Sequence, residues 1–274
     1  PRRLAPMSPP TASSRPRKVK DLERGGFHNH LYEALGLNYA YKAFTTHDLP
    51  AAVGGIRALG IRGCAISMPF KEACIPLLDA LDPSAAVIDS VNTIVNDQGR
   101  LTGYNTDFLA IAQLLDSHGV SPGLSFALRG SGGMAKAVAF ALRQAGFRQG
   151  HIVARNPAAG QALAQASGFA WAAELGELRP ALLINVTPIG MAGGPEAQDL
   201  AFPAAAIERA EIVFDVVALP AETPLIRHAR ALGKPVITGA EVATLQALEQ
   251  FVLYTGRRPS PEQVAQAAAY SRQS

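Results

Sequence analysis

The sequence predicts an α/β protein, and three observations carry that prediction. Short apolar runs typical of strands alternate along most of the chain with segments of helical period. The 274 residues suit one large domain or two modest ones, and a composition of 48% hydrophobic and 17% charged residues can bury a sizeable core. A glycine-rich turn at residues 130–135 lies between a predicted strand and a predicted helix. Two successive α/β series are therefore expected, the second beginning after Asp107.

The charge of the chain is unevenly distributed. The net charge is +3, but the first 26 residues hold seven basic and two acidic side chains, so the remainder carries −2. A mildly acidic body is not typical of nucleic-acid binders. The basic N-terminal segment shows no period and is expected to be a solvated tail.

The cysteines, the histidines and the apolar runs limit which cellular compartment and which binding partners are expected. No apolar run has the length of a membrane-spanning helix, and no signal-peptide core is apparent. Cys64 and Cys74 have no metal-ligand spacing, so reduced thiols are expected, and the six histidines form no cluster that predicts a metal site. We expect a cytoplasmic protein with a small-molecule substrate and no nucleic-acid or membrane partner; a monomer and a homodimer remain open.

The first series contains helices, strands and a hairpin. An apolar stripe beginning at Phe27 predicts a short helix that ends at Gly36. Asp48 has the form of an N-cap, for a helix that ends before Gly60. The remaining predicted elements are strands at 39–44 and 64–67, a helix at about 71–81, and hairpin strands at 91–96 and 101–105. This alternation predicts a mostly parallel sheet.

A polar cluster is expected where these elements end. Met68-Pro69 stops the strand at 64–67, because proline cannot donate to a sheet ladder, and Lys71 follows at once. The hairpin, whose turn is Asp97-Gln98-Gly99, delivers three polar side chains: Asn92, Asn105 and Asp107. A lysine and an aspartate at element ends suit proton transfer to a hydroxyl. The alternative is a surface lysine and a helix-capping aspartate.

The second series repeats strand and helix with little interruption. Its predicted strands lie at 125–129, 151–154, 182–185, 212–215 and 236–237. Its predicted helices lie at 108–117, 136–144, 158–166, 223–232, 241–254 and 259–270. This pattern is typical of βαβ units and a parallel sheet.

The glycine-rich turn has the form Gly130-x-Gly132-x-x-Ala135. The first glycine permits the turn, the second lets the backbone approach a pyrophosphate, and the small third residue permits close packing of helix and strand. The N-terminus of the following helix attracts the anion. The flanking βαβ pattern favours dinucleotide binding over an ordinary tight turn.

The residue that ends the second strand indicates which nucleotide binds. Sites that prefer NAD place a carboxylate there to bond the ribose hydroxyls, but this strand ends in Arg155. A guanidinium suits a 2′-phosphate, so NADP is the predicted cofactor, with NAD as the alternative. Asn156 and Lys136 are candidates to assist, and a surface arginine is the other interpretation of Arg155.

Two further constellations carry polar groups. Asn185 to Met191 leaves a strand end and, in a doubly wound sheet, borders the ligand crevice. Gln246 lies in an otherwise apolar helix, where a partly buried amide needs a partner such as a substrate hydroxyl. Gln246 facing solvent is the equal alternative.

Together these motifs resemble those of the shikimate dehydrogenases, and most closely the shikimate dehydrogenase-like subgroup. The resemblance spans about residues 27–256, and its markers keep the family's order and spacing: Phe27-His28-Asn29, Ser67-Met68-Pro69-Phe70-Lys71, Val91-Asn92-Thr93-Ile94, Gly103-Tyr104-Asn105-Thr106-Asp107, the glycine turn, Asn185-Val186-Thr187, Gly190-Met191, and Gly239 with Gln246. It implies an oxidoreductase that interconverts shikimate and 3-dehydroshikimate with NADP or NAD. It also implies a substrate-binding domain of residues 1–104, completed by 239–274, and a Rossmann domain of residues 105–238.

The resemblance also assigns roles to residues. It implies that Lys71 and Asp107 are the catalytic pair, and that the substrate is held by Ser67, Asn92, Asn105 and Gln246. It implies that the cofactor is bound by Gly130, Ser131, Gly132, Gly133, Met134, Ala135, Arg155, Asn156, Thr187, Val216 and Gly239. Quinate or a related analogue is the alternative substrate, and a nucleotide-binding regulatory protein with vestigial activity is the alternative class.

Three positions depart from the family pattern. Ser67 replaces a threonine and keeps the hydroxyl, whereas Ala218 replaces a tyrosine and removes an aromatic wall. The family holds the substrate carboxylate with a Ser-x-Ser pair shortly before the His-Asn of its first helix, and residues 21–26 offer no serine. The resemblance therefore leaves the carboxylate contact unassigned.

Overall fold

The structure is a computed structural model that describes residues 26–273, so the basic segment before Gly26 lies outside it. The described chain divides into two compact units. The first comprises residues 26–46 and 259–273, and the second comprises residues 47–258.

The first unit pairs helix α1 (Gly26–Ala34) with helix α11 (Pro261–Gln273), which confirms both predicted helices. The strand predicted at residues 39–44 does not form. The Asn29 side chain instead bonds both the N–H and the C=O of Tyr41, so it occupies the groups that a strand would offer to a ladder. The buried His28 ring stacks on Tyr41 at 4.4 Å, and burial lowers the pKa of His28 to about 4.

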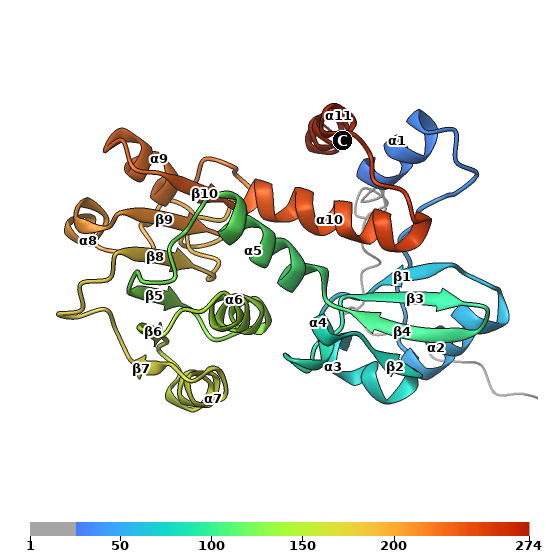
Figure 1. The fold of residues 1–274 in the computed structure, drawn as a ribbon, viewed down its shortest axis with the longest axis horizontal. Helices are drawn as coiled ribbons and strands as arrows, with labels where there is room; N and C mark the ends of the chain where they lie inside the picture. The colour runs from blue at the N-terminus through green and yellow to red at the C-terminus, as the bar shows by residue number, and fades with distance from the viewer. Residues whose placement is uncertain (1–25, 274) are drawn as a thin grey trace, which may run out of the picture. The chain divides into compact units, whose positions relative to one another are not determined.

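The second unit holds two sheets, and the smaller one is mixed (Figure 1). Its order is β1 (Gly63–Ala65), β3 (Thr93–Asp97), β4 (Arg100–Tyr104), β2 (Ala80–Leu81). Only the β2–β4 pair is parallel, so the predicted mostly parallel sheet is wrong here. The predicted hairpin is confirmed: Gln98 and Gly99 both have positive φ, as a two-residue type I′ turn requires.

The helix predicted at about 71–81 is also wrong in extent. One helical turn, α3 (Phe70–Ala73), is followed by a 3₁₀ turn, Ile75–Leu77, and then by β2. Pro76 lacks an N–H and its ring opposes a longer helix. Beyond it, β2 pairs with β4. Helix α2 (Leu49–Ala58) is confirmed with Asp48 as its N-cap, and the short α4 (Pro83–Ala86) was not predicted.

The larger sheet has six parallel strands, and its order confirms the predicted Rossmann-type α/β fold. Along the sheet these are β10 (Val236–Thr238), β9 (Ile212–Asp215), β8 (Leu182–Asn185), β5 (Phe126–Arg129), β6 (Gly150–Val153) and β7 (Ala170–Ala172). Of these, only β7 was not predicted. The sequence order reverses between β5 and β8, which is where ligands bind in open α/β sheets.

Helices cover both faces of this sheet (Figure 1). One apolar cluster joins it to α6 (Gly133–Gln144), α7 (Pro157–Ser167) and α5 (Thr106–Ser117). A second cluster joins the other face to α8 (Ala204–Arg209) and α9 (Pro224–Ala231). Of these, only α8 was not predicted.

Helices α5 and α10 (Gly239–Thr255) pack along one another and connect the two sheets (Figure 1). They run antiparallel, since His118 at the end of α5 bonds Glu241 at the start of α10 at 2.9 Å. Among the described residues, no helix combines the length and apolarity needed to cross a bilayer.

Candidate active site

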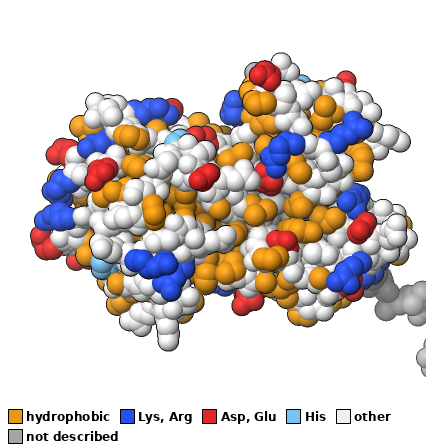
Figure 2. All heavy atoms as spheres, viewed as in Figure 1, with side chains coloured by type: hydrophobic (Ala, Val, Ile, Leu, Met, Phe, Trp, Pro, Cys, Tyr) orange, Lys and Arg blue, Asp and Glu red, His pale blue; other side chains and the backbone are white. Residues whose placement is uncertain are grey.

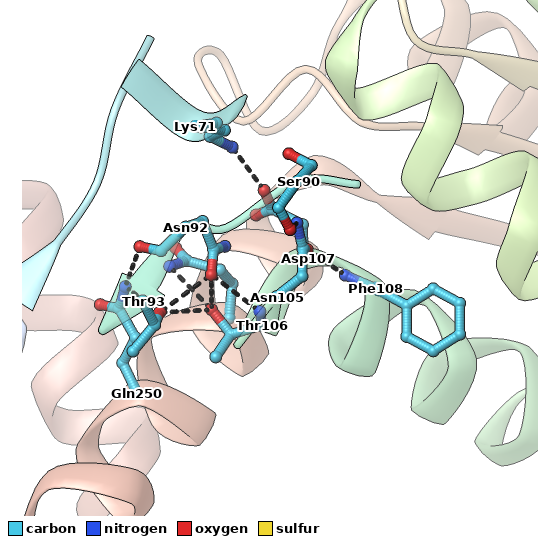
Figure 3. Close-up of polar contacts among 10 residues, drawn as sticks. Lys71, Ser90, Asn92, Thr93, Asn105, Thr106, Asp107, Phe108 and Gln250 are labelled. Carbon is cyan, nitrogen blue, oxygen red and sulfur yellow. Dashed lines mark hydrogen bonds and ion pairs between the residues drawn. The ribbon is translucent and has the colours of Figure 1, made fainter. Parts of the chain in front are cut away.

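Lys71 and Asp107 form an ion pair between α3 and the first turn of α5 (Figure 3). Lys71 Nζ lies 2.8 Å from Asp107 Oδ2, and the two side chains are 25% and 12% exposed. The pair is thus largely shielded from solvent yet reachable. Asp107 lies in the first turn of α5, and its contact holds the Lys71 side chain in place.

Asn92 and Asn105 lie beside this pair and are both buried. Asn92 Oδ1 accepts hydrogen bonds from the Thr106 N–H at 2.8 Å and from the Thr93 hydroxyl at 2.9 Å. Asn105 caps α5, because its Oδ1 accepts from the Phe108 N–H at 3.0 Å. These bonds fix both amide planes, and Asn92 Nδ2 has no hydrogen-bond partner within residues 26–273.

Gln246 joins this group, while Ser67 stands apart from it. Gln246 Nε2 donates to Thr106 Oγ1 at 3.3 Å, so the partly buried amide does find a polar partner. Ser67 is exposed in the loop between β1 and α3, four residues before Lys71. The structure therefore brings together four of the predicted polar groups: Lys71, Asp107, Asn92 and Asn105, with Gln246 bonded to the residue before Asp107.

Sequence reasoning missed Gln250. Its buried Nε2 donates to Thr93 Oγ1 at 2.9 Å and contacts the Asn92 C=O at 3.4 Å (Figure 3). It lies one helical turn after Gln246, so the spacing of the two glutamines was the available signal. Gln250 orients the segment that carries Asn92.

The glycine-rich turn presents backbone rather than side chains. Gly130 has φ +127°, and a Cβ there would lie 2.7 Å from Val186 Cγ2. A Cβ at Gly132 or Gly133 would meet nothing within 4 Å, so the turn borders open space. Gly132 caps α6 without any side-chain bond, which leaves the first N–H groups of the helix available. Ala135 is fully buried, as close helix–strand packing requires.

Thr187 follows β8 and Gly239 follows β10, and β9 lies between these two strands. Thr187 Oγ1 donates to Asn185 Oδ1 at 2.6 Å, and Asn185 Nδ2 donates to Asp215 Oδ1 at 3.0 Å. Burial raises the pKa of Asp215 against the lowering effect of its hydrogen bonds. A Cβ at Gly239 would come within 2.4 Å of Val216 O, so α10 begins directly against the loop after β9.

Arg155 and Asn156 follow β6. Arg155 is exposed and has no ion-pair partner within residues 26–273. The Asn156 side chain caps α7 by accepting from the Ala159 N–H at 3.2 Å. Of the predicted cofactor residues beyond the turn, Arg155 is thus the cation that remains available for an anion.

Lys136, the other cation considered for a phosphate, is paired elsewhere. Its Nζ lies 2.7 Å from Glu72 Oε1, and the side chains are 36% and 67% exposed. Glu72 follows Lys71 on α3, so adjacent residues of one helical turn bind α5 and α6. Among residues 26–273, no group of three His, Cys, Asp or Glu side chains is arranged to hold a metal ion.

Comparison with known proteins gives four matches of consequence. Residues 25–94 match the family described as the shikimate dehydrogenase substrate binding domain. The shikimate dehydrogenase-like protein of Haemophilus influenzae is 55% identical over 246 residues, covering 90% of this chain and 91% of that protein.

Solved structures agree with the sequence matches. The structure of a shikimate 5-dehydrogenase-like protein is 53% identical, with a TM-score of 0.90 over 94% of each chain. That of shikimate 5-dehydrogenase from Thermus thermophilus, in complex with NADP(H) and shikimate, is 32% identical, with a TM-score of 0.81 over 93% of this chain and 97% of that one.

Proposed function

The chain belongs to the shikimate dehydrogenase family, and we propose that it catalyses the reversible, NADP-dependent interconversion of shikimate and 3-dehydroshikimate. The observation that carries the proposal is the shielded Lys71–Asp107 ion pair, which lies beside three amide side chains able to bond hydroxyls. The relatives described above favour shikimate over quinate as the substrate.

Lys71 and Asp107 exchange a proton with the reacting oxygen of the substrate. Lys71 Nζ donates a proton as the ammonium when the carbonyl is reduced, and as the neutral amine it accepts the proton when the hydroxyl is oxidised. Asp107 keeps the ammonium oriented and compensates its charge at 2.8 Å. Because both groups are mostly buried, their attraction is screened less than that of a surface pair.

The amides hold the ring hydroxyls. Asn92 has an Nδ2 group available beside an Oδ1 that is already fixed, so it binds a hydroxyl without reorganising. We assign the neighbouring contacts to Asn105, Gln246 and Ser67. Gln250 supports these contacts indirectly, through its hydrogen bond to Thr93.

The residues of the larger sheet fit a dinucleotide phosphate. When bound, NADP supplies the hydride acceptor for the alcohol. The open space beside Gly132 and Gly133 leaves room for a pyrophosphate next to uncapped N–H groups. The exposed Arg155 offers a guanidinium for the 2′-phosphate. The remaining contacts fall to Ser131, Met134, Asn156, Thr187, Val216 and Gly239.

The two sheets support separate binding roles for two parts of the chain. We assign substrate binding to residues 1–104 with 239–274, and cofactor binding to residues 105–238. The unpaired thiols Cys64 and Cys74 suit a reducing compartment, and we place the protein in the cytoplasm. On the face shown in Figure 2, acidic and basic side chains are interspersed, which suits a small-molecule substrate better than nucleic acid.

Steady-state kinetics with shikimate and quinate, each with NADP and NAD, test the proposal. We expect the highest kcat/KM with shikimate and NADP. A higher value with quinate would replace the substrate assignment. Tight NADP binding without turnover on either substrate would instead indicate a nucleotide-binding regulatory protein.

A further inference from the structure

Arg129 is the last residue of β5 and directly precedes the glycine-rich turn. It lies opposite Val153 in the parallel ladder, so the two side chains share a face of the sheet. Ala127 and Val153 lie in one apolar cluster, which confirms that face. Arg155 lies in the bend two residues after Val153, and its charge acts on Arg129. Two arginines thus lie at the carboxyl ends of adjacent strands.

The Arg129 side chain is held in place. Its Nη1 donates to the C=O of Ala201, and its guanidinium carbon lies 6.0 Å from the centroid of the Phe202 ring. Nε and Nη2 make no hydrogen bond with any residue of the described chain, and Arg129 has no ion-pair partner there. The guanidinium is therefore oriented, while part of its donor fork remains unused.

Its electrostatic surroundings are unfavourable for a free cation. Burial lowers the pKa of Arg129, the charge of Arg155 lowers it further, and Glu196 only partly compensates. A partly desolvated cation next to a second one is costly unless an anion joins them. A phosphate with up to two negative charges would offset both the desolvation of Arg129 and its repulsion by Arg155.

We propose that Arg129, together with Arg155, forms the subsite that binds the 2′-phosphate of NADP and thereby sets the preference for NADP over NAD. The inference rests on the proposed cofactor. In this arrangement the fixed Arg129 orients the phosphate, and the exposed Arg155 provides the second guanidinium contact. A planar fork bonds two phosphate oxygens, which lysine cannot reproduce.

Binding of two nucleotide fragments, measured by titration calorimetry without any turnover, tests the subsite. Adenosine 2′,5′-bisphosphate carries the 2′-phosphate and 5′-AMP lacks it. We expect Arg129→Met to weaken the bisphosphate about tenfold or more and to leave 5′-AMP unchanged. Arg155→Met should act in the same way, and the double variant should bind both fragments equally. Arg179→Met, which removes an exposed arginine paired with Glu177, is the matched control and should bind both as the wild type does.

Two results would overturn the inference. Unchanged bisphosphate binding by Arg129→Met would exclude a contact, and an equal loss for both fragments would show that Arg129 only supports the loop at Ala201. If Arg129→Met does not fold, Arg129→Lys decides. A loss of about threefold or more for the bisphosphate alone supports the fork, and wild-type binding rejects it. A wild-type protein that does not distinguish the fragments would instead reject NADP as the cofactor.

Discussion

The two sides of the proposed active site are built by different means. On the substrate side, buried side chains bond one another, and the Lys71–Asp107 pair is only 25% and 12% exposed. On the cofactor side, the turn offers uncapped N–H groups and open space at Gly132 and Gly133. The difference teaches that a hydroxyl undergoing chemistry needs oriented side chains, whereas a phosphate can be recognised mainly by backbone. Substitutions should therefore act on the two sides in different ways.

The largest effect is expected at Lys71. Replacing it with alanine should lower kcat about 10²- to 10⁴-fold, because general acid–base groups contribute that much, and should leave NADP affinity nearly intact. Stopped-flow kinetics and a fluorescence titration of NADP measure the two quantities. Lys42→Ala, at an exposed lysine of the first unit, is the control. A loss below tenfold would remove Lys71 from the proton transfer.

The pair should also act as a unit. Asp107→Ala should lower kcat by itself, but adding it to Lys71→Ala should cost little more, because the second substitution removes an interaction that is already lost. The four kcat values of the double-mutant cycle measure the coupling. Losses that multiply would show that the two residues act independently.

On the cofactor side, backbone geometry should matter more than side-chain identity. Gly130→Ala should lower the free energy of unfolding by about 1–3 kcal/mol, because φ is +127° and the new Cβ would lie 2.7 Å from Val186 Cγ2. Gly133→Ala, in open space, should not lower it. Urea denaturation measures both values. Equal stability of the two variants would contradict the strained turn.

Arg155, like Arg129, is an exception on that side, since its side chain should determine the choice of cofactor. Arg155→Asp should lower kcat/KM with NADP about ten- to a hundredfold and leave NAD unaffected or improved. Added salt should weaken NADP binding of the wild type more than NAD binding, because the contact is exposed. The assignment fails if the aspartate variant keeps its preference for NADP.

The smallest effect is expected at Glu72, next to Lys71 on the same helical turn. Its pair with Lys136 is 67% and 36% exposed, and such pairs contribute about 0–1 kcal/mol. Glu72→Gln should therefore change the unfolding free energy by less than about 1 kcal/mol and kcat by less than about threefold. Thermal unfolding and steady-state kinetics check this. A loss of kcat comparable to that of Lys71→Ala would contradict the expectation that the exposed pair matters less than the buried one.

Local signals in the sequence predicted much of this arrangement. The positive-φ turn at Gln98-Gly99 follows from a glycine between alternating strands, and the Asp48 cap follows from its place before an apolar stripe. The parallel sheet of six strands follows from five apolar runs spaced by helices. Lys71 and Asp107 were predicted as site residues because each stands at the end of an element.

Other features depend wholly or partly on contacts between distant residues. The helix predicted at 71–81 stops early because Pro76 opposes it and β2 pairs with β4. Lys136 is bound by Glu72, which lies 64 residues away in the sequence. The position of Lys136 near the glycine-rich turn therefore did not indicate this ion pair. Gln250 was missed because a buried glutamine and an exposed one look alike in a helical sequence. Any feature before Gly26 lies outside the described chain.

Helix α10 fixes the spacing of the residues that it carries. Gly239, which is pressed against the loop after β9, precedes Gln246 by seven residues and Gln250 by eleven. At about 100° per residue, all three lie within roughly 40° on one stripe, so on the proposed assignment a single continuous helix sets the distance and the angle between the cofactor-binding end and the hydroxyl-binding end. One residue inserted between Gly239 and Gln246 would turn both glutamines by about 100° and shift them by about 1.5 Å. The stretch can thus change its composition, but it cannot change its length one residue at a time.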